Sequence, residues 1–107
     1  MAPEIPVASV DEAALWYAET LGFRTTMKMP GGDYAIVERD GAALHLFRGE
    51  AAAVSLHIFV GGIEALAEEL EARGAPIAQP LTRKPWGARD FRLFDPSGNE
   101  LKFTEGD

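Results

Sequence analysis

Cysteine is absent from this 107-residue sequence. Its absence excludes disulfide bonds, thiolate metal sites and thiol nucleophiles. The sequence also has no apolar run near the roughly 20 residues that a membrane-spanning helix needs. Its N-terminus lacks the basic and apolar segments of a secretory signal. We therefore expect a cytoplasmic protein that does not insert into membranes.

Basic residues are also scarce, because 10 Lys and Arg stand against 17 Asp and Glu, a formal net charge of -7. This charge repels phosphate backbones and anionic lipid, so neither nucleic acid nor a membrane surface is an expected partner. A cationic ligand is tolerated better than an anionic one. The length suits a single domain over residues 1–107, since little chain is left for a second independent core.

Two stretches are predicted to be helices. Ser9 followed by Glu12 forms a capping-box pattern, which opens an apolar-faced helix over Val10–Leu21. A second stretch, over about residues 63–73, carries apolar residues on one face and glutamates on the other. A glycine follows each stretch and can end the helix.

Short runs with strand-like alternation surround both helices. The predicted strands are Ile5–Ala8, Arg24–Met29, Tyr34–Arg39, Ala42–Phe47, Val54–Val60, Pro76–Gln79, Arg89–Phe94 and Glu100–Thr104. Asp40-Gly41 between two such runs is a strong hairpin signal. The order predicts an α+β fold of two tandem βαβββ modules with curved mixed sheets, one over about residues 1–50 and one over about 51–107.

Proline positions and turn residues predict a first strand with few backbone donors, one long loop and a hairpin near the C-terminus. Pro3 and Pro6 leave the first strand short of backbone donors, which suits an edge strand or a strand that crosses to another chain. Pro80–Gly87 is the longest predicted loop. Beyond it, the order Asp95-Pro96-Ser97-Gly98 favours a type I turn, and the strands on either side of that turn predict an antiparallel hairpin.

These residues resemble a known family. Leu21-Gly22-Phe23 after the first helix, and Pro85-Trp86-Gly87 leading to Asp95-Pro96-Ser97-Gly98-Asn99, resemble the vicinal-oxygen-chelate superfamily of glyoxalases, bleomycin-resistance proteins and extradiol dioxygenases. Bleomycin-resistance proteins are the closest likeness. The resemblance implies two modules whose curved sheets enclose a site, commonly in a homodimer whose grooves each draw on both subunits.

Metal-using relatives place His, Glu or Gln at four inward-facing strand positions, which the resemblance carries to Ala2, His45, Ser55 and Lys102. Only His45 is an ordinary ligand, whereas a divalent ion needs about three such donors. We therefore expect no metal and no cofactor, which argues against isomerase, dioxygenase and fosfomycin-modifying activities. A register slip of two residues would bring in His57, with Glu38 or Glu100 needed to complete a site.

Eight residues are predicted to contact a ligand. They are Trp86, His45, His57, Phe47, Phe59, Ser55, Phe91 and Lys102. Six of them have a structural alternative: the histidines can be hydrogen-bonded strand residues, the phenylalanines core, and Trp86 a cover for the sheet end or a dimer contact. A second group of carboxylates could meet a cationic ligand. They are Asp33, Glu38, Asp90 and Glu100.

The leading functional hypothesis is a metal-free, dimeric protein that sequesters a planar or cationic small molecule, with a bleomycin-type antibiotic as the candidate. The first alternative is an enzyme of the same superfamily (lyase, isomerase or dioxygenase), either metal-dependent or using His45 or His57 as a general base. The second is a degenerate relative with a collapsed groove, which a structure with no pocket beside Trp86 would favour.

Overall fold

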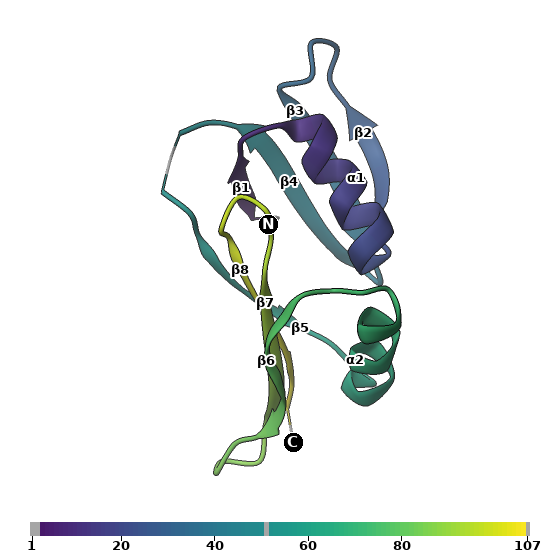
Figure 1. The fold of residues 1–107 in the computed structure, drawn as a ribbon, viewed down its shortest axis with the longest axis vertical. Coiled ribbons are helices and arrows are strands. Elements are labelled where there is room, and N and C mark those ends of the chain that lie inside the picture. The colour runs from purple at the N-terminus through teal and green to yellow at the C-terminus, as the bar shows by residue number, and fades with distance from the viewer. Residues whose placement is uncertain (1–2, 51, 107) are drawn as a thin grey trace.

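A computed structural model describes residues 3–50 and 52–106 and contains two helices and eight strands in these residues (Figure 1). The elements in chain order are β1 (Glu4–Val7), α1 (Val10–Leu21), β2 (Arg24–Lys28), β3 (Tyr34–Arg39), β4 (Ala42–Arg48), β5 (Ser55–Phe59), α2 (Ile63–Ala72), β6 (Ile77–Arg83), β7 (Arg89–Phe94) and β8 (Glu100–Glu105). The predicted α+β class with two βαβββ modules is confirmed.

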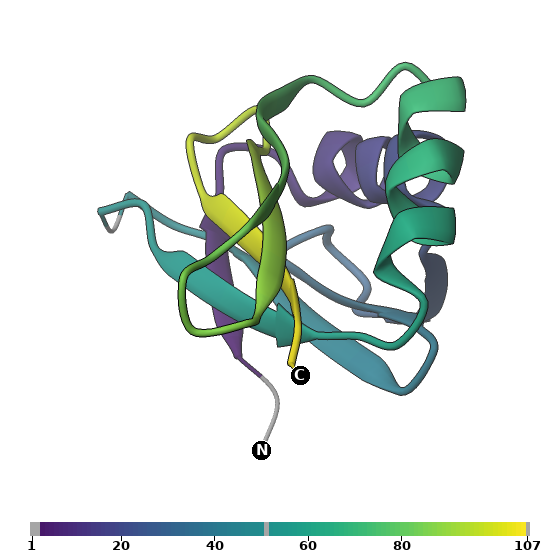
Figure 2. The ribbon, with the colours of Figure 1, turned by 90° about the horizontal axis from the view of Figure 1, so that it is seen from below.

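The two modules build sheets of the same topology. Sheet A has the strand order β1-β4-β3-β2, and sheet B has the order β5-β8-β7-β6. In each sheet the first strand pairs in parallel with the last strand of its module, and the other pairs are antiparallel. Both helices lie on one side of the molecule, with the strands on the other (Figure 2). β1 is an edge strand of sheet A, which accommodates its prolines.

Alternation along the strands decides which side chains meet the helices. Ala35 and Val37 of β3, like Phe91 and Leu93 of β7, are fully buried, whereas their neighbours along each strand are more exposed. Because successive side chains point to opposite faces, each sheet has a face covered by its helix and a second face that we call the open face. The helix-covered faces of both sheets join one apolar core.

α1 begins and ends as predicted. The Ser9 hydroxyl accepts a hydrogen bond from the Glu12 backbone N–H at 3.3 Å, and Gly22 ends the helix with a φ of 73°. No helix in residues 3–50 and 52–106 is long and apolar enough to cross a membrane.

β6 is longer than predicted. It continues to Arg83, so the first half of the predicted Pro80–Gly87 loop is strand. Pro80 cannot donate to a neighbouring strand, but β6 is at the edge of sheet B, where that loss is tolerated. The pairing with β7 shifts register between Gln79 and Thr82, on either side of the proline. Pro80 therefore interrupts the alternation of apolar and polar residues in the sequence, but it does not end the strand.

The Asp95 carboxylate joins the two modules. Oδ1 accepts the backbone N–H groups of Ser97 and Asn99, both at 2.9 Å, which shape the β7–β8 turn. Oδ2 accepts the Tyr17 hydroxyl of α1 at 2.8 Å and the Asn99 side-chain amide at 2.9 Å. That amide also donates to the backbone oxygen of Pro6 in β1 at 2.9 Å. The predicted turn is thus an anchor between modules.

Because this anchor is buried, the loss of one of its hydrogen bonds lowers the stability of the fold more than the loss of an exposed one. Asp95 is only 5% exposed and Tyr17 is fully buried, and this burial, with the adjacent carboxylate, raises the pKa of the Tyr17 hydroxyl. Removing one partner of a buried, charged hydrogen bond leaves the other unsatisfied.

We expect Tyr17→Phe to lower the free energy of unfolding by about 1.5–3 kcal/mol, because it deletes the hydroxyl that Asp95 accepts. Urea denaturation followed by circular dichroism measures the change. Tyr34→Phe is the matched control, since Tyr34 is only partly buried and lies outside the anchor. Equal losses in the two variants would contradict the role given to the anchor.

Candidate functional site

Most of the predicted ligand residues lie on the open faces of the two sheets. His45 and Phe47 alternate with the buried residues of β4 and therefore lie on the open face of sheet A. Ser55, His57 and Phe59 lie on the open face of sheet B in the same way. Lys102 joins them, because it alternates with buried residues of β8. The single chain thus divides the predicted site between two faces.

On sheet A, His45 is held by a neighbouring strand. Its Nδ1 is hydrogen-bonded to the Tyr34 hydroxyl of β3, and the two rings meet edge to face with centroids 5.6 Å apart. Glu4 of β1 is the register partner of His45 and therefore lies on the same face. The arrangement fixes the imidazole ring while its Nε2 is left for another partner.

On sheet B, Glu100 is the centre of a charge network. Its carboxylate accepts the Ser55 hydroxyl at 2.6 Å and Arg92 Nη1 at 3.1 Å, and Lys102 Nζ lies 3.6 Å away. The Ser55 hydrogen bond and these two cations lower the pKa of Glu100. The carboxylate is therefore ionised at neutral pH and already paired.

The other acidic candidates differ in their availability. Asp33 forms an ion pair with Arg48 at 3.3 Å. Asp90 accepts the Gln79 amide at 2.7 Å and lies 3.5 Å from Lys84 Nζ. Three of the four carboxylates are thus paired with a cation. The exception is Glu38, whose contact in the described residues is the hydroxyl of a neighbouring threonine at 2.8 Å.

Three predicted aromatic residues have different surroundings. Phe59 and Trp86 are the most exposed large apolar side chains described, at 76% and 72%. Trp86 lies in the short connection between β6 and β7, and none of the five best-defined cavities of the described residues is lined by it. Phe91 is a correction: it is fully buried on the helix-covered face and stacks on Phe103 at 5.1 Å, so it belongs to the core.

Because none of these five cavities lies beside Trp86, they bear on the alternative of a collapsed groove. For one copy of the chain, this counts in favour of that alternative. The exposed rings themselves remain available to a ligand or a second copy.

The residues of one chain do not fit a divalent metal ion. Ala2, one of the four positions suggested by the resemblance, lies outside the described residues. Register pairs Lys102 with His57, and Glu100 with Ser55, so His57 lies beside the Lys102 position. His45 is on the other sheet, and the described residues contain no cluster of three or more His, Asp or Glu side chains. An ammonium group beside His57 also opposes a cation.

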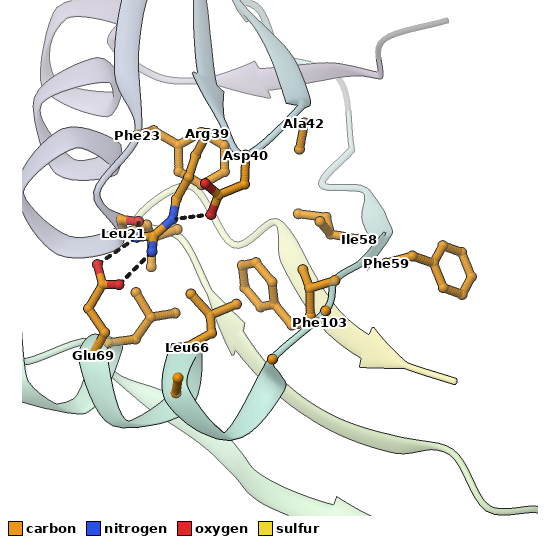
Figure 3. A pocket seen from close by; sticks show the side chains of 15 residues that line it. Leu21, Phe23, Arg39, Asp40, Ala42, Ile58, Phe59, Leu66, Glu69 and Phe103 are labelled. Atoms are coloured by element: carbon orange, nitrogen blue, oxygen red, sulfur yellow. Dashed lines mark hydrogen bonds and ion pairs between the residues drawn. The ribbon is translucent and has the colours of Figure 1, made fainter. Parts of the chain in front are cut away.

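A cavity between the modules was not predicted. It has a volume of about 400 Å³ and apolar walls that include Phe23, Ile58 and Phe103 (Figure 3). A second cavity of about 500 Å³ is lined by His57 and Phe59 together with residues at the start of β4. Both cavities include Asp40, in the β3–β4 turn.

Arg39 closes one side of the first cavity by joining the modules (Figure 3). Its Nη1 donates to the backbone oxygen of Leu21 and to Glu69 Oε2 of α2, both at 2.7 Å. Glu69 also accepts Arg73 Nε at 2.9 Å. The hydrogen bonds from Arg39, followed by those from Arg73, lower the pKa of Glu69 to about 2. No local pattern links Arg39 to a helix 30 residues away, so the sequence offered no signal for this pair.

Comparison with known proteins identifies the family. Residues 2–103 match the family model described as the Glyoxalase/Bleomycin resistance protein/Dioxygenase superfamily. The chain therefore belongs to this superfamily, and the resemblance drawn from its motifs is confirmed. A search of curated proteins gave no match.

Solved structures share the fold. A bleomycin-binding protein from bleomycin-producing Streptomyces verticillus, complexed with copper(II)-bleomycin, is 28% identical, with 100% of this chain and 95% of that chain covered and a TM-score of 0.82. A bleomycin resistance determinant encoded on the transposon Tn5 is 20% identical, with 100% and 97% covered and a TM-score of 0.87. Lactoylglutathione lyase from Agrobacterium tumefaciens is 19% identical, with 99% and 92% covered and a TM-score of 0.79. The same fold thus occurs in a bleomycin-binding protein, a resistance determinant and a protein named as a lyase.

The Arg39–Glu69 pair predicts an acid-sensitive stability. Because the folded state lowers the pKa of Glu69, the stabilisation is present above the ordinary glutamate pKa of 4.5 and is lost as the pH falls towards about 2. We expect Glu69→Gln to lower the unfolding free energy by about 0.5–1 kcal/mol at pH 7, a figure reduced for solvent screening. The difference from the unmodified chain should shrink on acidification.

Denaturant unfolding of both proteins at pH 7 and near pH 3 measures this change. Glu68→Gln, on the exposed face of the same helix, is the matched control. A difference for Glu69→Gln that is unchanged between the two pH values would contradict the assignment.

Proposed function

We propose that this chain is a metal-free binding protein that sequesters a planar or cationic small molecule without turnover. The observation that carries the proposal is the pair of exposed rings on the open face of sheet B, where His57 and Phe59 have centroids 6.3 Å apart. A planar ligand can stack on such rings.

A homodimer is proposed because the candidate residues are divided between two faces. The open face of sheet A carries His45 and Phe47, and that of sheet B carries His57 and Phe59. A second copy that places its sheet A face against this sheet B face would form a groove from both. Exposed rings on a small domain favour such a contact. We also propose that residues 1–107 act as one cytoplasmic domain with no nucleic-acid or membrane partner.

A bleomycin-type antibiotic is the candidate ligand. Support comes from the 28% identical Streptomyces verticillus protein, whose structure is a complex with copper(II)-bleomycin. The net charge of -7 favours a basic ligand over an acidic one. Glu38, the carboxylate without a cationic partner in the described residues, supplies a local counter-charge on the open face of sheet A.

A metal-independent enzyme is the second candidate. The observation in its favour is the hydrogen bond between the Tyr34 hydroxyl and His45 Nδ1, because a general base needs an oriented ring. In this case His45 Nδ1–H would donate to the Tyr34 oxygen, which leaves Nε2 as the acceptor that takes the proton from a substrate.

Elemental analysis of the purified protein separates the metal-free proposal from a metal-dependent enzyme. We expect far less than one equivalent of metal per chain, because Lys102 stands beside His57 and the donors of one chain are dispersed. One tightly held equivalent of zinc, iron, manganese or nickel would overturn the proposal.

Titration with metal-free bleomycin tests the antibiotic. We expect quenching of tryptophan fluorescence and measurable heat, with Phe59→Ala weakening binding about tenfold, or about 1.4 kcal/mol, because a stacking ring is lost. Leu15→Ala is the matched control, since Leu15 is 59% exposed but lies on α1, away from the open faces. No quenching and no heat at high micromolar bleomycin would end the antibiotic proposal.

A further inference from the structure

Lys102 and Arg92, on the open face of sheet B, have N–H groups that make no hydrogen bond within the described residues. Lys102 makes no hydrogen bond within residues 3–50 and 52–106, and its one ion pair, to Glu100, is 3.6 Å long. Arg92 donates a single hydrogen bond, from Nη1 to Glu100, although a guanidinium carries five N–H groups. No polar side-chain atom is left both buried and without a partner in these residues, so the spare donors are open to solvent.

The charges on this face leave a surplus of one positive charge. Arg92 and Lys102 share one carboxylate, that of Glu100, while Lys84 faces Asp90. Three cations therefore stand against two carboxylates. Arg89 and Glu105 also belong to these strands, but they alternate in phase with the buried residues and so lie on the helix-covered side, where Arg89 also pairs with Glu64 of α2. The local charge is opposite in sign to the net charge of the chain.

Aromatic rings flank the two cations. Strand register places His57, Lys102 and Arg92 in one row across β5, β8 and β7. Phe59 is two residues beyond His57 on β5, and Phe94 is two residues beyond Arg92 on β7, so both lie on the same open face. Phe94 is 45% exposed, and Phe59 more so. A charged centre between exposed rings suits a planar molecule with one anionic group.

We infer that Lys102 and Arg92 form a subsite for the carboxylate of a planar small molecule. A guanidinium fork holds a carboxylate through two parallel hydrogen bonds, and the Lys102 ammonium adds a point charge beside it. The inference rests on the proposed small-molecule site and applies to a planar ligand that carries a carboxylate, so it does not require the antibiotic. A cationic part of the same ligand would use Glu38, on the other sheet.

Three probes of nearly the same shape test the sign of the charge. Benzoate is an anion, benzamide is neutral and benzamidine is a cation. We follow the His57 ring resonances by NMR during titration of the intact protein with each probe. Benzoate should shift them saturably, with an affinity at least fivefold higher than that of benzamide, and benzamidine should bind more weakly than either.

Variants separate the subsite from general electrostatics. Lys102→Met should weaken benzoate at least fivefold and leave benzamide within twofold, whereas Lys102→Arg should retain benzoate. Lys28→Met is the matched control, because it also removes one lysine charge but on β2 of the other module. Circular dichroism checks that each variant folds.

Two results would overturn the inference: benzamidine binding as tightly as benzoate, or Lys102→Met and Lys28→Met weakening benzoate equally. The bleomycin titration is independent of both. Loss of bleomycin binding with benzoate retained would reject the antibiotic and keep the subsite, and the reverse would reject the subsite alone.

Discussion

The buried Asp95 carboxylate is the constraint on which the arrangement of the two modules depends. Its two oxygens accept four hydrogen bonds, from the turn that contains it and from α1 of the other module. A buried carboxylate is costly unless it is fully hydrogen-bonded, so the turn, α1 and β1 are stable in one relative position. The Arg39–Glu69 pair adds a second tie between the modules, nearer to solvent.

This arrangement decides what each sheet exposes. Since α1 and α2 cover one face of each sheet, the open faces carry the side chains that the core does not take. The two open faces differ in chemistry. Sheet A presents the His45 imidazole, oriented by Tyr34, whereas sheet B presents Lys102 and an excess of positive charge between exposed aromatic rings. Two faces of different chemistry in one chain suit a groove that two copies build together, which is the basis of the proposed function.

Much of the fold could be predicted because local signals agreed with the final packing. The bounds of α1, β3 and β7 were as predicted, and the Asp95 turn formed where its residue order indicated. β6 was misjudged because Pro80 breaks a local pattern that an edge strand tolerates. Phe91 was assigned to the wrong face, because alternation gives the period of a strand and not which phase meets the helix.

The sequence by itself determined the fold class, the repeated module, the tight turns and the family, since each depends on residues close together in the chain. Only the tertiary structure decided that His57 lies opposite Lys102 in the sheet and that Arg39 forms an ion pair with Glu69. It also decided that most candidate carboxylates are already in ion pairs. Such pairings depend on strand register and on contacts between modules. These are set by burial summed over the whole chain, and no local pattern of residues records them.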